Sequence, residues 1–243
     1  MAQDRILPDL IDRPAAAMRA VVARPKSWWI AAAIVLVTLL AYASVTGPYQ
    51  QAAQAEAQAA MVERLAAQAS PEQAEAMRAS VEAASAQRPI VTTLLITAVT
   101  AAFGWLLWAG GAHLGSLFFG GRGEFAHTWA VTVWSQLPRA LGYLATMIYT
   151  WINDAIPAHE GLAFLVGTGD LLRDAANPAY LALSSISPFA IWSLILLIVG
   201  VRAATGLGRT AAIILILLLW GLGLALTLVP SLLMGGLTAS LMG

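Results

Sequence analysis

Residues 28–46 read WWIAAAIVLVTLLAYASVT, a run of 19 residues without a charged side chain. A helix needs about 20 consecutive apolar residues to cross the hydrocarbon core of a bilayer. This run therefore predicts a membrane-spanning helix, and further apolar runs follow it along the chain. The composition agrees, because 59% of the residues are hydrophobic and 11% are charged, whereas soluble domains have about 25% charged residues.

The apolar runs predict an all-α, polytopic membrane helix bundle with five transmembrane helices. The whole chain should form one membrane domain. Residues 135–139 (SQLPR) interrupt the third span, where the missing N–H of Pro138 should bend the helix and free a backbone carbonyl. The expected spans are residues 28–47, 90–119, 125–152, 186–203 and 211–234.

The distribution of basic residues predicts the orientation of the bundle. Lys and Arg in short loops favour the cytoplasmic side of a membrane. A cytoplasmic N-terminus places eight basic residues inside, including Arg122, Arg202 and Arg209 in short turns, and four outside. The opposite orientation would carry both basic turns across the membrane. We therefore expect the N-terminus inside and the C-terminus outside.

Residues 1–27 predict a cytoplasmic amphipathic arm. Apolar side chains from Leu7 to Val22 recur at helical spacing, and Arg13, Arg19 and Arg24 lie off that stripe. Two interpretations remain open at this point. The arm either lies on anionic lipid at the membrane interface, or it contacts the protein's own bundle.

Residues 48–89 predict an extracytoplasmic helical hairpin. The composition changes after Gly47-Pro48 to Ala, Gln and Glu, which are strong helix formers. The sequence from Ser70 to Gln73 has the pattern of a capping box, so we expect helices over about 50–68 and 71–87. Apolar residues are sparse in this hairpin. We therefore expect it to pack on residues 153–185, an extracytoplasmic loop with short interfacial segments.

Arg139 is the strongest candidate for a polar intramembrane site. A charge in mid-span costs about 2.5–3.5 kcal/mol on insertion scales, so its side chain should face the bundle or a water-filled cavity. Ser135, Gln136 and the carbonyl freed by Pro138 are its expected partners. Arg139 is then either a polar switch or lipid-head site, or a structural residue that holds the kink.

Two further groups of residues are weaker candidates. Glycines on the second span should allow close helix packing: Gly104, Gly111 and Gly115. A second group near the following turn could hold zinc or act as a base, but its spacing matches no ligand motif: His113, Glu124 and His127. The chain has no cysteine. We expect no metal, no cofactor and no enzymatic activity.

Residues 11–29 read IDRPAAAMRAVVARPKSWW, with a proline early in the arm and a WW pair at its end. This stretch, together with residues 120–138 and 191–212, resembles the Yip-domain family of membrane proteins, in its bacterial branch, whose opening helix has a similar proline and WW pair. Residues 120–138 resemble the central stretch, with a glycine turn and Leu137-Pro138. Residues 191–212 (IWSLILLIVGVRAATGLGRTAA) resemble the closing stretch. The resemblance implies five spans, a cytoplasmic N-terminus and no enzymatic activity.

These features predict a multi-pass protein of the bacterial cytoplasmic (inner) membrane. The resemblance implies a non-enzymatic scaffold or accessory subunit of a larger complex, such as one with an ABC exporter. The alternative is a small transporter or lipid-translocating protein with a path lined by Arg139. The expected partners are membrane lipids and a membrane protein complex or a second copy. The zero net charge indicates no nucleic-acid partner.

Overall fold

The computed structural model describes residues 6–67, 69–84, 89–169, 173–174 and 176–242, and these residues form helices, turns and loops without a strand. The predicted all-α class is therefore confirmed. Within the described chain, four helices are long and apolar enough to cross a membrane. They are α3 (Trp28–Ala66), α5 (Ile90–Phe118), α10 (Pro188–Thr205) and α11 (Arg209–Met242).

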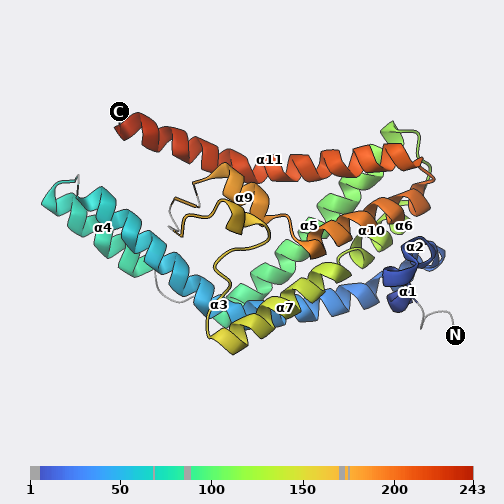
Figure 1. Ribbon diagram of the computed structural model, residues 1–243, viewed down its shortest axis with the longest axis horizontal. Helices are drawn as coiled ribbons and strands as arrows, with labels where there is room; N and C mark the ends of the chain where they lie inside the picture. Colours follow the sequence, from blue (N-terminus) through green and yellow to red (C-terminus); the bar gives the residue numbers. More distant parts are fainter. Residues whose placement is uncertain (1–5, 68, 85–88, 170–172, 175, 243) are drawn as a thin grey trace.

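The third predicted span is built from two helices, α6 (Phe125–Trp134) and α7 (Leu137–Asn153). Together they extend from one end of the bundle to the other (Figure 1). The break lies inside the predicted interruption at residues 135–139, but Pro138 does not cause it, because the first helix already ends at Trp134. Pro138 lies in the first turn of α7, where its missing N–H breaks no helical hydrogen bond. The total of five spans remains a prediction.

Helix α3 continues through Pro48 into the predicted hairpin. The first hairpin helix, expected over about residues 50–68, is therefore not a separate helix but the continuation of the first span. A helix that is already formed extends at little cost, and the Ala, Gln and Glu residues after Pro48 favour extension. Near the end of the apolar run, water can hydrogen-bond the carbonyl that Pro48 leaves without a donor. The first span and the first hairpin helix form one rod of 39 residues.

The hairpin closes with α4 (Pro71–Ala84). The Ser70 N–H donates to Gln73 Oε1 at 3.3 Å and the Gln73 N–H donates to Ser70 Oγ at 3.4 Å, which is the predicted capping box. Arg78 donates two hydrogen bonds to Glu63, with Nε to Oε1 at 3.0 Å and Nη2 to Oε2 at 3.1 Å. These contacts join α4 to α3.

The hairpin packs mainly within itself. Helix α4 lies along α3 and projects to the side, away from α9 (Pro178–Ser184) and the loop around it (Figure 1). Helix α4 packs on α3, which supplies the surface that α4 needs, and the expected contact of the hairpin with residues 153–185 is seen at its base. At the base of the hairpin the Tyr49 hydroxyl donates to the carboxylate of Asp154.

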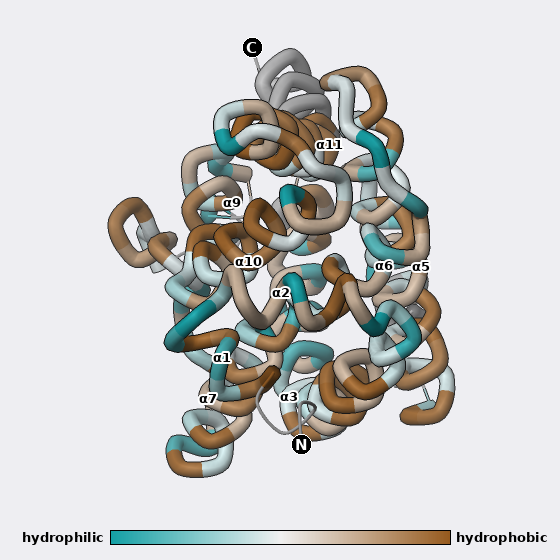
Figure 2. The backbone as a smooth tube through the Cα atoms, turned by 90° about the vertical axis from the view of Figure 1, so that its right-hand side faces the viewer, coloured by the Kyte–Doolittle hydropathy of each residue, from teal (hydrophilic) through white to brown (hydrophobic). Residues whose placement is uncertain are grey.

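The N-terminal arm forms α1 (Ile6–Asp12) and α2 (Pro14–Ala23) and packs on the bundle. Ala17, Met18 and Val21 are fully buried. Figure 2 looks onto this end of the molecule and shows α2 across its centre, with α10, α6 and α3 around it. Of the two interpretations of the arm, contact with the protein's own bundle is the correct one for its apolar stripe.

The two basic turns meet at the same end of the bundle as the arm (Figure 1). The Arg122 N–H donates to the Thr205 carbonyl at 2.8 Å. A Cβ atom at Gly123 would lie 2.3 Å from the Ala204 carbonyl oxygen, so only glycine allows this approach. The predicted orientation requires both turns on one side of the membrane, and the fold agrees with that requirement.

The glycines of α5 divide into two groups. Cβ atoms at Gly111 and Gly115 would meet the side chains of Leu219 and Leu215 on α11, at 3.0 and 2.3 Å. Nothing lies within 4 Å of a Cβ atom at Gly104. The predicted GxxxG pair therefore packs within the chain, whereas Gly104 lies on an open face.

The segment after α7 includes the short helices η2 (Ala163–Leu165) and α9. Buried Asp174 connects two parts of this segment by hydrogen bonds. Its carboxylate accepts from the Thr168 N–H at 2.8 Å, the Thr168 hydroxyl at 2.7 Å and the Gly169 N–H at 3.2 Å. Burial alone would raise the pKa of Asp174, but these hydrogen bonds outweigh burial and lower the pKa below its usual value. The carboxylate is therefore ionised at neutral pH.

Gly200 tests the packing of the arm. A Cβ atom there would lie 2.7 Å from Val131 Cβ and 3.2 Å from Met18 Sδ, so Gly200→Ala should push α10 away from α6 and α2. We expect a loss of about 1–3 kcal/mol of unfolding free energy, measured by thermal or denaturant unfolding in detergent. The matched control is Gly104→Ala, which gains helix propensity without a clash and should be neutral or stabilising by up to about 1 kcal/mol. Equal effects of the two substitutions would contradict this packing.

Candidate functional site

The junction between α6 and α7 is a break in backbone hydrogen bonding inside the bundle. The Gln136 N–H bonds to the Val133 carbonyl at 3.1 Å, so the Thr132 carbonyl loses its usual helical donor. Two side chains replace that donor: Ser135 Oγ donates to the Thr132 carbonyl at 2.6 Å and Gln136 Nε2 donates to it at 3.4 Å. Both side chains are buried. The Thr132 carbonyl is therefore paired by local side chains although its helical donor is lost.

This pairing overturns the expected role of Ser135 and Gln136. Both were predicted as partners of Arg139, and both instead bind the Thr132 carbonyl. The physical reason is distance along the chain, because a carbonyl three or four residues back lies within reach of short side chains. The kink consequently does not need Arg139.

Arg139 lies in the first turn of α7, next to this break. Its Nε atom is buried and has no hydrogen-bond partner among the described residues. An unpartnered guanidinium inside a membrane bundle is costly, which is why such residues usually serve a site or a polar path. Arg139 therefore remains the strongest candidate for a polar intramembrane site.

A chain of polar side chains leads from Arg139 toward the opposite end of α7. Tyr143 lies one turn further along the helix and interacts electrostatically with both Arg139 and Glu160. Its ring packs on Tyr42 of α3, with the centroids 5.1 Å apart. The Tyr42 hydroxyl accepts a hydrogen bond from Gln50 Nε2 at 3.1 Å. We call Arg139, Tyr143, Tyr42, Gln50 and Glu160 the polar column.

The polar column was not predicted from the sequence. Tyr143 follows Arg139 by four residues and so shares its helix face, which was an available signal. Tyr42, Gln50 and Glu160 come from α3 and from the loop after α7, and no local pattern connects them to Arg139. Their shared location follows from the packing of α3 against α7.

Two more buried polar groups belong to α6 and α10. Trp134 Nε1 at the end of α6 and Ser193 Oγ on α10 have no hydrogen-bond partner in the described part of the chain. Helix α10 packs on both α6 and α7. This part of the bundle therefore has two hydrogen-bond donors without a partner in addition to the Arg139 guanidinium. Donors and a cation suit the binding of an anionic or hydroxyl-bearing group better than they suit nucleophilic catalysis.

The weaker candidates lie elsewhere. His113 of α5 faces α6: its Nδ1 lies 3.5 Å from Thr128 Oγ1 and its ring packs edge-on against Phe125. Glu124 precedes α6 without capping it through its side chain, and His127 lies in the first turn of α6. Among the described residues, the structure forms no group of three His, Cys, Asp or Glu side chains that could hold a metal ion.

Comparison with known proteins supports the family resemblance. No curated protein and no solved structure matches the chain. The profile of the Yip1 domain family matches residues 9–229, which cover most of the arm and of the long apolar helices, the polar column and both basic turns. The chain belongs to the Yip1 domain family and is a membrane protein with several apolar helices.

Proposed function

We propose that this chain is a non-enzymatic accessory protein of a larger membrane complex and that it contacts its partner through the α3–α4 hairpin. The observation that carries the proposal is the continuity of α3. One helix of 39 residues leaves the bundle, and α4 folds back along its projecting end. A rigid projection of this kind suits recognition beyond the membrane.

The hairpin is ordered by contacts of its own. The capping box at Ser70 starts α4, and the two hydrogen bonds between Arg78 and Glu63 hold it against α3. Ala66 and Ala74 are buried in the hairpin, with exposed fractions of 8% and 7%. A partner would therefore meet a preformed surface and lose little conformational entropy on binding.

Apolar side chains remain exposed on the projecting part of α3. Met61 and Leu65 are 40% and 42% exposed, on successive turns of one helix face. Large apolar side chains at this spacing are typical anchors for a partner helix. We propose a partner on the extracytoplasmic side of the bacterial inner membrane, such as a subunit that accompanies an ABC exporter.

Removal of the hairpin tests this proposal. A chain that lacks residues 54–86, joined by a Gly-Ser bridge, keeps Tyr49 and Gln50 in place. We expect it to insert and unfold like the full chain but to lose its partners, as measured by pull-down of tagged protein in mild detergent with mass spectrometry. Met61→Gln with Leu65→Gln should reproduce most of that loss.

The matched control for the point variants is Glu72→Gln with Glu75→Gln, two exposed positions of α4. This control should recover the same partners as the unchanged chain. Recovery of the same partners by the chain without the hairpin would show that recognition lies in the spans or the arm. Recovery of the full chain alone at every expression level would contradict the accessory function itself.

A second function is favoured by the buried, unpartnered Nε of Arg139. In this alternative the chain moves a small anionic solute or a lipid headgroup along the polar column. Tyr143 and Tyr42 would continue the path toward Glu160, because each interacts electrostatically with that carboxylate. The alternative needs neither a cofactor nor a catalytic residue.

Arg139→Leu separates the transport function from a structural role. Removal of a half-buried charge that has no ion-pair partner among the described residues should leave stability unchanged or raise it by up to about 3 kcal/mol. If Arg139 lines a path, the same substitution should reduce solute flux or lipid flipping in reconstituted vesicles by about tenfold or more, given the usual cost of losing a charge-assisted hydrogen bond. The exposed Arg209→Gln is the control and should change neither quantity. An unchanged flux in the Arg139→Leu variant would show that the polar column is not the transport path.

A further inference from the structure

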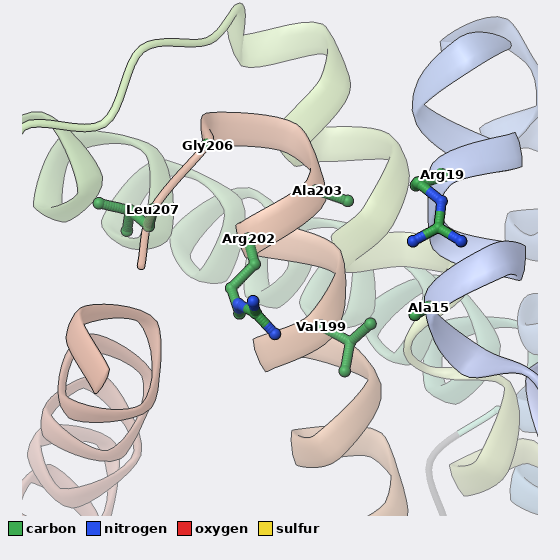
Figure 3. Close-up of a pocket in the computed structure, with 7 residues that line it drawn as sticks. All are labelled: Ala15, Arg19, Val199, Arg202, Ala203, Gly206 and Leu207. Carbon is green, nitrogen blue, oxygen red and sulfur yellow. The ribbon is translucent and has the colours of Figure 1, made fainter. Parts of the chain in front are cut away.

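A pocket of about 180 Å³ opens at the end of the bundle that carries the arm and both basic turns. It lies between α2 and the last turns of α10. Figure 3 shows the side chains of Arg19 and Arg202 extending from these two helices, with Val199 and Ala203 between them. The lining residues are Ala15, Arg19, Val199, Arg202, Ala203, Gly206 and Leu207.

The two arginines have no protein partner among the described residues, because neither makes an ion pair or a hydrogen bond there. Both side chains are exposed. Helices α2 and α10 contain no Asp or Glu at all. The pocket therefore presents two guanidinium groups without a counter-charge on either of the helices that form it.

The backbone of the pocket does not cancel this positive charge. The C-terminal end of a helix has partial negative charge because its last carbonyls lack donors. At the end of α10 three of these carbonyls are occupied: Val201 accepts from the Thr205 hydroxyl at 2.7 Å, Arg202 from the Gly206 N–H at 3.0 Å, and Thr205 from the Arg122 N–H at 2.8 Å. The local field is therefore dominated by the two arginines.

We propose that this pocket binds the phosphate group of an anionic phospholipid. Guanidinium groups bind phosphate oxygens through paired hydrogen bonds, and two of them can hold one phosphate from two sides. The apolar side chains of Val199, Ala203 and Leu207 offer a surface for the start of an acyl chain. The site lies at the basic end of the bundle, where the headgroups of the predicted cytoplasmic leaflet would be.

Helix α2 uses different side chains to contact the bundle and to line the pocket. The apolar stripe of α2 is buried in the bundle through Met18 and Val21. Arg19 lies off that stripe and faces the pocket. A lipid that binds both Arg19 and Arg202 would join α2 to α10 at their outer edge, so its binding should stabilise the packed arm.

Lipid titration of the purified full chain tests the proposal. Delipidated protein in detergent is titrated with phosphatidylglycerol, with phosphatidylcholine and with glycerol 3-phosphate, and binding is followed by native mass spectrometry and by the unfolding temperature. We expect saturable binding of phosphatidylglycerol with a rise in unfolding temperature, and weaker effects of the other two. Arg19→Gln with Arg202→Gln should weaken phosphatidylglycerol binding about tenfold or more, as two charge-assisted contacts are lost.

The matched control is Arg13→Gln with Arg209→Gln, which removes two exposed charges outside the pocket lining. It should leave phosphatidylglycerol affinity within about twofold, as expected for screened surface charges. Because a cation in the last turn of α10 also favours that helix, the unfolding temperature of each variant is compared without lipid as well. Equal loss in both double variants would overturn the site in favour of diffuse surface charge. Equal binding of glycerol 3-phosphate and phosphatidylglycerol would retain the phosphate site but assign it to a soluble anion.

Discussion

The hydrogen bonds to the Thr132 carbonyl at the break between α6 and α7 are the constraint on which the rest of the structure depends. No water is present in the hydrocarbon core to pair a free backbone group, so a break is tolerated only where the protein supplies partners. Ser135 and Gln136 supply them at the Thr132 carbonyl. The break allows two helices to replace one span, and their neighbours differ in part: both pack on α3 and α10, and α6 also packs on α5 and α2.

Because of this arrangement, the two ends of the bundle carry different contacts and different polar groups. At one end α2 packs on α6 through the buried side chains of Met18 and Val21. At the same end a backbone hydrogen bond from Arg122 to Thr205 joins the two basic turns. At the other end α7 leads through Tyr143 and Tyr42 to the loop that carries Glu160. Arg139 lies between them without a structural task in the break. The proposed phosphate pocket and the polar column are therefore separate features of one bundle.

The sequence predicted those features that depend on local chemistry. The charge-free run from Trp28 to Thr46 and the capping box at Ser70 each act over a few residues, and the structure contains both. Features that depend on context were missed. Pro48 looks like a helix boundary in isolation, but it follows a helix that is already formed and is followed by strong helix formers. An apolar stripe such as that of α2 has the same pattern whether it faces lipid or protein. Arg19 and Arg202 line one pocket, and the ring of Tyr143 packs on that of Tyr42. The members of each pair come from distant parts of the chain, and only the packed fold brings them together.

The central claim of this account is that α6 and α7 form one crossing of the membrane in spite of the break between them. Single-cysteine labelling tests it directly, because the natural chain contains no cysteine. Glu124→Cys precedes α6 and Ala158→Cys follows α7, and both positions are exposed. In intact cells, a membrane-impermeant maleimide should label the cysteine at position 158, and the cysteine at position 124 should react only after permeabilisation. Labelling of both positions in intact cells, or of both only after permeabilisation, would show that α6 and α7 enter and leave on the same side and would contradict the account.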